Sequence, residues 1–188
     1  MKKIIYIIAI IISVFYKAQQ VYPLNTDFDN VPPNSYLKDI NNELNPFSGT
    51  YKANYQGKEI TLFITMETMK FLQSLNVYQD ILSVKYIIKN QNGVVLQDTQ
   101  NMNFQLNQLK HTIFSHGTYP NKNVAWFNYG GTNCGVGWGA IELKKLNATQ
   151  ISWEYRPNDI ILDSARCPQG ADINIYLPET KDLIFTKQ

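Results

Sequence analysis

The chain has 188 residues, with 17 Lys and Arg against 15 Asp and Glu and a formal net charge of +2. Three of the lysines lie within the first 17 residues, which contain no acid, so the remainder carries 17 − 3 = 14 basic and 15 acidic side chains. This near-neutral balance excludes the basic footprint of a nucleic-acid-binding protein or a polybasic membrane binder. Beyond the leader, a chain of about 170 residues is the size of one domain.

The first residues have the pattern of an export signal. Lys2 and Lys3 precede an uninterrupted apolar run from Ile4 to Phe15, and Ala18 provides a small residue for cleavage. This run is too short to span a bilayer, which takes about 20 apolar residues. We therefore predict a signal peptide at 1–19, export to the periplasm or extracellular space, and no stable membrane anchor after cleavage.

Residues 20–47 form a lead segment rich in proline and asparagine. Proline removes backbone donors, so we expect an extended strap lying on the domain and not a central strand. A helical turn is expected near residues 35–42. Residues 48–188 are predicted to form a single β domain.

From Gly49 onward, apolar residues recur with the period of two that is typical of strands. A hairpin is predicted from residues 50–55 and 58–65, which flank a Gln56-Gly57 turn. Further strands are expected at residues 78–89, 94–99, 110–117, 124–129, 136–145, 149–155, 172–177 and 183–186. One short helix is predicted over 67–76, where Met69, Leu72 and Leu75 are spaced by three residues.

These short, regularly spaced strands favour an all-β, mainly antiparallel fold. A single closed or nearly closed barrel best removes exposed strand edges, and a β-sandwich is the alternative. The barrel interior would hold either a packed core or a ligand cavity. Core packing is the default role of large aromatic residues, and they are also the candidates to line such a cavity: Tyr51, Tyr86, Trp126, Trp138, Trp153 and Tyr155.

The chain contains two cysteines, Cys134 and Cys167, and both lie in turn-like sequence. An exported protein meets an oxidising compartment, so we predict a structural disulfide between them. By loop entropy, this link would contribute about 3 to 4 kcal/mol. No motif connects either cysteine to a histidine, which argues against a nucleophilic role.

Other chemical motifs favour structural roles. The segment from Gly130 to Gly139 lacks the spacing of a dinucleotide or P-loop fingerprint, so its glycines are expected in turns and close backbone contacts. His111 and His116 are five residues apart in an expected strand and face opposite sides, which excludes a shared metal ion. The stretch around Ser115 and His116 also lacks a hydrolase elbow.

Glu142 and Glu154 are each flanked by apolar residues that belong to the opposite face of a strand. We expect both carboxylates to point into solvent and not to form an acid–base pair. The sequence predicts no catalytic residue, no metal ligand and no cofactor.

Three blocks of the chain, taken together, resemble one known family. They begin at Val21, at Phe47-Ser-Gly-Thr-Tyr and at Gly131-Thr-Asn-Cys-Gly-Val-Gly-Trp-Gly. The set is similar to domain of unknown function 6705, an uncharacterised family of small secreted Bacteroidetes proteins. The likeness implies export but no activity. Asp163-Ser164-Ala165 also resembles an O-glycosylation site of such proteins, although an exposed turn explains Ser164 equally well.

A wider likeness is to the calycins, the lipocalin-like barrels, whose first strand opens with Gly-x-Trp. Here the position is Gly49-Thr50-Tyr51, with tyrosine in place of tryptophan. The arginine that commonly packs on this aromatic ring has Lys181 or Lys187 as its nearest counterpart. The resemblance implies barrel architecture and, by analogy, ligand binding.

We weigh three functions from these observations. The first is non-enzymatic binding of a small apolar or amphipathic ligand in the barrel. The second is an envelope or extracellular module that contacts another protein. The third, ranked last, is a hydrolase, which requires a cleft holding His111 or His116 beside a carboxylate or hydroxyl group.

Overall fold

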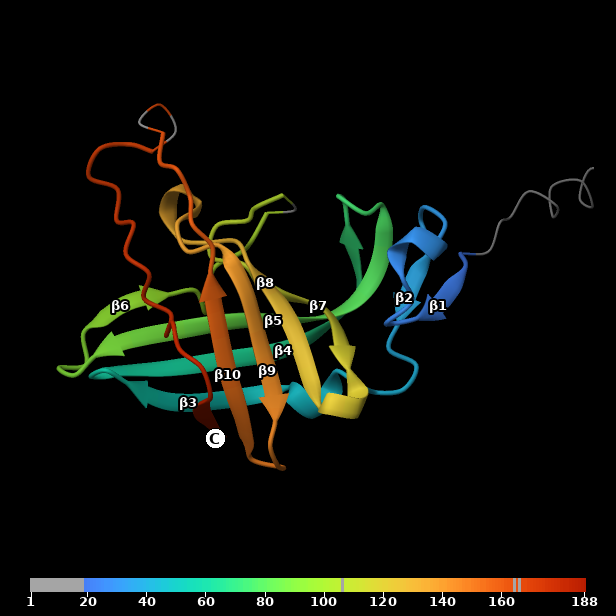
Figure 1. Cartoon of the computed structure of the whole chain (residues 1–188), viewed down its shortest axis with the longest axis horizontal. Helices are drawn as coiled ribbons and strands as arrows, with labels where there is room; N and C mark the ends of the chain where they lie inside the picture. The colour runs from blue at the N-terminus through green and yellow to red at the C-terminus, as the bar shows by residue number, and fades with distance from the viewer. Residues whose placement is uncertain (1–18, 106, 164, 166) are drawn as a thin grey trace, which may run out of the picture.

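A computed structural model of the chain describes residues 19–105, 107–163, 165 and 167–188. Apart from Gln19, the predicted signal peptide lies outside the described residues, as does Ser164. The chain forms an antiparallel barrel of eight strands (Figure 1), so the predicted all-β barrel is confirmed. The division of the chain into leader, lead segment and domain stays a prediction.

The barrel strands follow one another around the sheet through hydrogen-bonded neighbours. Their order is β5, β4, β3, β11, β10, β9, β8 and β7, and β7 then pairs with β5. The bounds are β3 Gly49–Tyr55, β4 Lys58–Leu72, β5 Val77–Asn90, β7 Ile113–Tyr119, β8 Val124–Tyr129, β9 Gly139–Lys145, β10 Gln150–Pro157 and β11 Leu183–Lys187.

Three further strands extend the sheet at β5. A short strand, β6 (Val95–Asp98), pairs with the C-terminal end of β5. At the other end of β5, β2 (Tyr36–Lys38) pairs in parallel, and β1 (Val21–Pro23) pairs in parallel with β2. Helical structure in the described residues is limited to four single 3-10 turns: η1 Phe28–Asn30, η2 Asn45–Phe47, η3 Pro120–Lys122 and η4 Asn133–Gly135.

Three sequence-based expectations were wrong in detail. The segment expected to be helical over 67–76 is the end of β4 and the turn after it, because β4 keeps pairing with β5 as far as Leu72 and Val77. The expected helical turn near 35–42 is strand β2. Residues 172–177 form no strand; they belong to a long excursion between β10 and β11.

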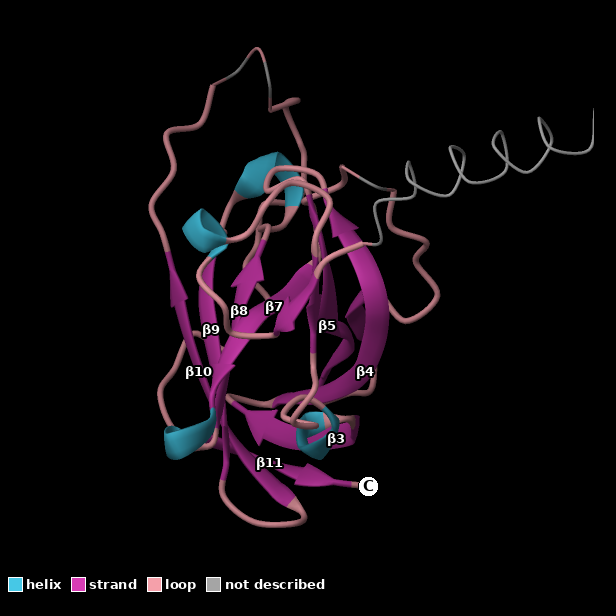
Figure 2. Cartoon of the chain, turned by 90° about the vertical axis from the view of Figure 1, so that its right-hand side faces the viewer, coloured by secondary structure: helices cyan, strands magenta, loops and turns pink. Residues whose placement is uncertain are grey.

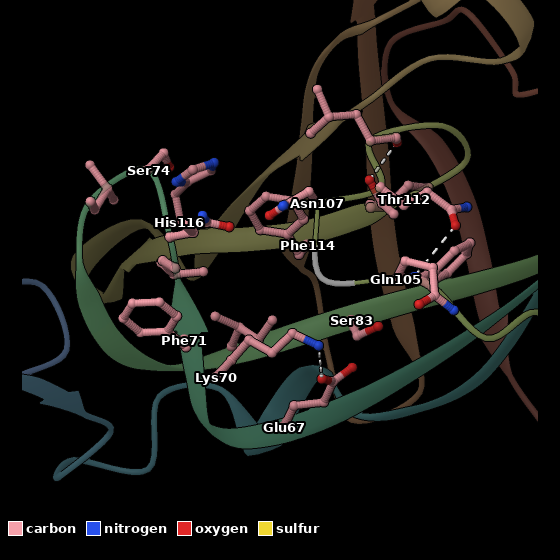
Figure 3. Close-up of a pocket in the computed structure, with 18 residues that line it drawn as sticks. Glu67, Lys70, Phe71, Ser74, Ser83, Gln105, Asn107, Thr112, Phe114 and His116 are labelled. Atoms are coloured by element: carbon pink, nitrogen blue, oxygen red, sulfur yellow. Dashed lines mark hydrogen bonds and ion pairs between the residues drawn. The ribbon is translucent and has the colours of Figure 1, made fainter. Parts of the chain in front are cut away.

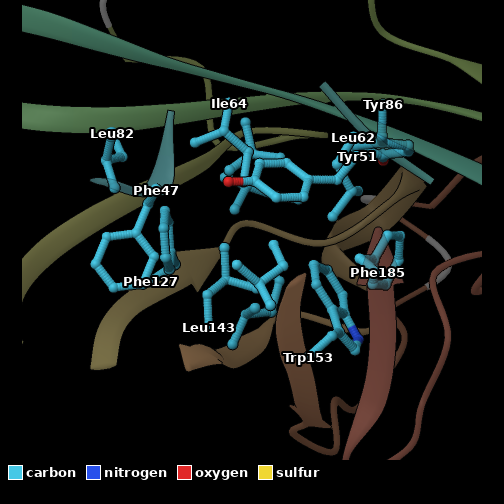
Figure 4. Close-up of a cluster of buried hydrophobic side chains, with 14 of the residues drawn as sticks. Phe47, Tyr51, Leu62, Ile64, Leu82, Tyr86, Phe127, Leu143, Trp153 and Phe185 are labelled. Atoms are coloured by element: carbon cyan, nitrogen blue, oxygen red, sulfur yellow. The ribbon is translucent and has the colours of Figure 1, made fainter. Parts of the chain in front are cut away.

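Side chains fill the barrel interior (Figure 4). The largest buried groups include Tyr51, Tyr86, Phe127, Trp153 and Phe185, and each of them is less than 2 % exposed. Within each strand, inward side chains alternate with outward ones, as the period of two requires. The interior is therefore a packed core.

One end of the barrel carries the counterpart of the calycin signature. Lys187 of β11 places its ammonium group 5.7 Å from the centre of the Tyr51 ring and donates to the Ser48 carbonyl at 2.8 Å. Of the two lysines considered in place of the calycin arginine, Lys187 occupies this position. The contact combines a cation–π interaction with a cap on the backbone that precedes β3.

The phenol groups of Tyr51 and Tyr86 have opposite environments. The Tyr51 hydroxyl is buried without a hydrogen-bond partner, whereas the Tyr86 hydroxyl lies 2.9 Å from Gln97 Oε1 and 3.3 Å from the Tyr129 hydroxyl. Burial raises the pKa of Tyr129 to about 12. We expect Tyr51→Phe to raise the free energy of unfolding by about 1 kcal/mol and Tyr86→Phe to lower it by about 1 to 2 kcal/mol.

Urea unfolding of the two variants beside the parent protein measures this difference. Each change removes one oxygen from a buried ring, so each variant is the matched control of the other. Equal destabilisation by both substitutions would contradict the assigned environments.

The lead segment shares the core with the barrel. Leu24, Leu44 and Phe47 pack in the same cluster of buried side chains as the strands, and Leu37 is completely buried. Segment 20–47 is thus held by apolar side chains, as a strap lying on the domain requires.

Candidate functional site

The C-terminal end of β4 and the N-terminal end of β5 leave the barrel together. They curl into a two-stranded arm, residues 66–82 (Figures 1 and 2). A bulge between Glu67 and Lys70 accompanies the bend, and Met69 within it has a φ of 53°. Bulges sharpen the local twist of a strand pair, which explains why the arm turns back toward the barrel.

A buried carboxylate holds the arm to the lead segment. Asp80 is 2 % exposed and accepts a hydrogen bond from the Tyr36 hydroxyl at 2.6 Å. It also accepts the backbone N–H groups of Asp39 and Met69, each at 3.0 Å. Burial and this carboxylate raise the pKa of Tyr36 to about 12. The carboxylate therefore joins the bulge, the arm and the strap.

The arm separates from β7 and leaves a seam in the barrel. Ser83 and Phe114 form the single backbone pair between β5 and β7. Toward the arm, side-chain hydrogen bonds join β5 and β7 in place of backbone pairs. Ser115 Oγ accepts the Leu82 N–H at 2.8 Å, and Gln79 Nε2 donates to the His116 carbonyl at 2.9 Å. The register of β7 against β8 shifts at His116, which shares the outer face of β7 with Phe114.

A groove lies between the arm, the outer faces of β5 and β7, and residues 104, 105 and 107–109 of the loop before β7 (Figure 3). Its volume is about 270 Å³. The apolar walls are formed by Phe71, Leu72, Leu75, Ile81, Phe104, Leu109, Ile113 and Phe114. Polar groups around them belong to Glu67, Lys70, Gln73, Ser74, Ser83, Gln105, Asn107, Gln108, Thr112 and His116.

His116 is the titratable ring in this groove. It stacks on Trp126 with ring centroids 4.9 Å apart and packs at a tilt on Phe114 at 5.3 Å. Its Nε2 lies 2.5 Å from Asn128 Nδ2. Burial lowers the pKa of His116 from its usual value, so the ring is neutral at pH 7.

The wall opposite the arm is also fixed by named contacts. Lys85 donates to the carbonyls of Gln100 and Met102 at 3.1 and 2.8 Å, and its ammonium group lies 5.9 Å from the Phe104 ring. Thr99, completely buried, accepts the Tyr86 N–H at 2.8 Å. Both walls are therefore held in place by contacts within the fold itself.

The six aromatic candidates do not form one site. Tyr51, Tyr86, Trp153 and Tyr155 belong to the packed core, where Trp153 donates to the Pro178 carbonyl at 2.9 Å. Trp126 lies on the outer face against His116, and Trp138 is 46 % exposed. The ligand-binding role of these six residues stays a prediction.

The other candidate groups have ordinary structural partners. His111 is buried beside Gln97, with 3.2 Å between its Nδ1 and Gln97 Nε2, and burial lowers its pKa. Arg156 pairs with both Glu154 and Glu142 on the outside of the barrel, at 2.9 and 3.8 Å, so these carboxylates point outward as predicted. In the described part of the chain, neither imidazole bonds to a carboxylate or hydroxyl group, and no three metal-ligating side chains cluster.

The glycine-rich segment makes a tight turn, as expected. Gly137 has a φ of 73°, and its carbonyl accepts a hydrogen bond from the Tyr155 hydroxyl. A Cβ atom at this position would lie 2.8 Å from Ile175 and 2.9 Å from the tyrosine oxygen. Glycine is required here by close packing and not by a phosphate group.

The predicted disulfide between Cys134 and Cys167 is present. It links the turn before β9 to the excursion between β10 and β11. Across residues 19–188, leaving out 106, 164 and 166, the chain has no helix of the length and apolar character needed to cross a membrane.

The fold defines the chain as a small closed β-barrel protein, with a groove outside the barrel. The chain belongs to the family of unknown function DUF6705, whose model matches residues 1–188. Comparisons with curated proteins and with solved structures each found no match.

Proposed function

We propose that this protein acts after export as a non-enzymatic binder of a small amphipathic molecule, held in the groove between the arm and β7. The observation that carries the proposal is a preformed hollow with apolar walls and polar side chains around them. Those properties are typical of ligand sites. Because side chains fill the barrel interior, we propose a site on the outer face in place of the expected site inside the barrel.

The size of the groove limits its occupant. A volume of about 270 Å³ lies just below the range of about 300 to 1,000 Å³ found for drug-sized ligands. A bicyclic aromatic group or a short alkyl chain fits this space. Phe71, Phe104 and Phe114 supply the apolar contact area.

Indole tests the proposal as a neutral, fragment-sized probe, followed by chemical shifts of the backbone amides. We expect saturable shifts for residues of the arm and of β7. Leu109→Asp, at a groove residue that is 65 % exposed, should weaken binding about ten-fold, because it brings a carboxylate to the apolar mouth.

Leu146→Asp is the matched control. Leu146 is 46 % exposed in the turn between β9 and β10 and does not line the groove, so this variant should bind indole as the parent protein does. Absence of saturable shifts, or an equal loss in both variants, would exclude the groove as a binding site.

A second candidate is an envelope module that contacts another protein. It is favoured by three successive apolar residues in the excursion after β10, Ile160 to Leu162, of which Ile161 is 95 % exposed. Runs of exposed apolar residues mark interaction sites. This function predicts no response of the groove to indole.

A further inference from the structure

The charged side chains that line the groove are paired with each other. Among the described residues that line it, Glu67 and Lys70 are the only ones with a full charge. Their side chains form an ion pair of 2.9 Å at the bulge of the arm (Figure 3). A charged ligand therefore meets no free counter-charge among the described side chains that line the groove.

The imidazole of His116 adds no charge. The nitrogen of the Asn128 amide faces Nε2 at 2.5 Å, and an amide nitrogen can only donate, so Nε2 accepts and carries no proton. The ring faces lie against Trp126 and Phe114, where an added charge would lose water. The lowered pKa of His116 agrees with this geometry.

We propose that the groove selects uncharged molecules over anions and cations of the same shape. This inference rests on the proposed function and names the chemical class of its ligand. An apolar wall cannot repay the hydration that a carboxylate or ammonium group loses, and the ion pair between Glu67 and Lys70 offers neither charge a partner. Neutral amides and hydroxyl groups can still bond to the marginal side chains, such as Asn107 and Gln105.

Three probes with one ring system test the selection at pH 7.5: indole, indole-3-acetate and tryptamine. They present the same bicyclic body with no charge, a negative charge and a positive charge. We expect both charged probes to bind about ten-fold more weakly than indole in amide-shift titrations.

Two variants each remove one charge of the ion pair between Glu67 and Lys70. Glu67→Gln leaves the Lys70 ammonium group without its carboxylate, so indole-3-acetate should gain about two- to five-fold in affinity. Lys70→Gln leaves the Glu67 carboxylate free and should favour tryptamine by a similar factor. Both side chains are about 40 % exposed, so neither change threatens folding.

An ion pair elsewhere on the barrel supplies the matched control. Lys52 and Glu59 are 3.8 Å apart on β3 and β4, with similar exposure, and they do not line the groove. Glu59→Gln and Lys52→Gln should leave the order of the three probes unchanged.

The possible results separate the two proposals. Tighter or equal binding of either charged probe to the parent protein overturns the selection for neutral ligands, while the groove remains a binding site. Unchanged probe preference in both Glu67→Gln and Lys70→Gln overturns the role assigned to the ion pair. Failure of all three probes to bind overturns the binding function and the inference together.

Discussion

Replacing Asp80 by alanine is expected to lower the free energy of unfolding by about 3 kcal/mol, because three hydrogen bonds to a buried carboxylate are lost. The Tyr36 hydroxyl and the N–H groups of Asp39 and Met69 would keep no acceptor at this position. The arm would then keep its backbone pairing with β2 but lose the side-chain link that fixes the bulge against the strap. Indole should therefore bind about ten-fold more weakly to the loosened groove.

Graded variants test the same network. Tyr36→Phe removes one of the three bonds and should cost about 1 kcal/mol, as measured by urea unfolding. Asp29→Ala, at an exposed carboxylate in η1, is the matched control and should unfold as the parent protein does. If Asp80→Ala and Asp29→Ala unfold at the same urea concentration, Asp80 does not hold the arm.

The barrel could be predicted from sequence because its interior imposes a simple rule on every strand. Tyr51 and Ala53 in β3, and Val84, Tyr86 and Ile88 in β5, alternate with outward residues. A packed interior needs an apolar group at every second position, and this pattern can be recognised in the sequence of each strand by itself. Strand pairing then follows from hairpin links and the need to close the edges.

The helix prediction failed because spacing alone does not identify a buried face. Met69 is 47 % exposed at the bulge, Leu75 is 38 % exposed in the turn, and Leu72 is half-buried between them. Their three-residue spacing therefore arises from a bulge and a turn, and not from one side of a helix. Tertiary pairing with β5 decides the structure of this segment.

The groove could not be derived from local patterns, because its walls come from distant parts of the chain. The arm meets β7 through tertiary contacts such as that of Gln79 Nε2 with the His116 carbonyl, and Lys85 of β5 holds the Met102 carbonyl just before Phe104. One sign was present in the sequence: Ile81 and Leu82 are adjacent apolar residues that break the alternation of β5. Both are buried, which shows that something covers the outer face there.

Size led the sequence-based choice of aromatic candidates, and size does not distinguish a core from a pocket lining. Trp153 and Tyr155 are inward residues that fill the core, whereas Phe114 and His116 are outward residues that line the groove beside the arm. His116 was considered for metal binding and hydrolysis, and its actual neighbours are Asn128 and two aromatic rings. The position of a residue relative to the arm, and not its type, determines its place in the groove.

Removing the disulfide is expected to lower stability without affecting the groove. Cys134 and Cys167 are separated by 33 positions, so replacing both by serine should lower the free energy of unfolding by about 3 to 4 kcal/mol through the entropy of the unfolded chain. For a chain of this length the expected fall in Tm is about 10 °C. Reduced parent protein should unfold at the same temperature as the double variant.

Ligand binding separates this effect from that of Asp80. The disulfide holds the excursion after β10, whereas the groove is built from the arm, β5, β7 and residues 104, 105 and 107–109. Under conditions where it is fully folded, the double cysteine variant should therefore bind indole with the affinity of the parent protein. A parallel loss of indole affinity would mean that the excursion and the groove form one cooperative unit, and unfolding at the parent temperature would mean that the link does not constrain the unfolded chain.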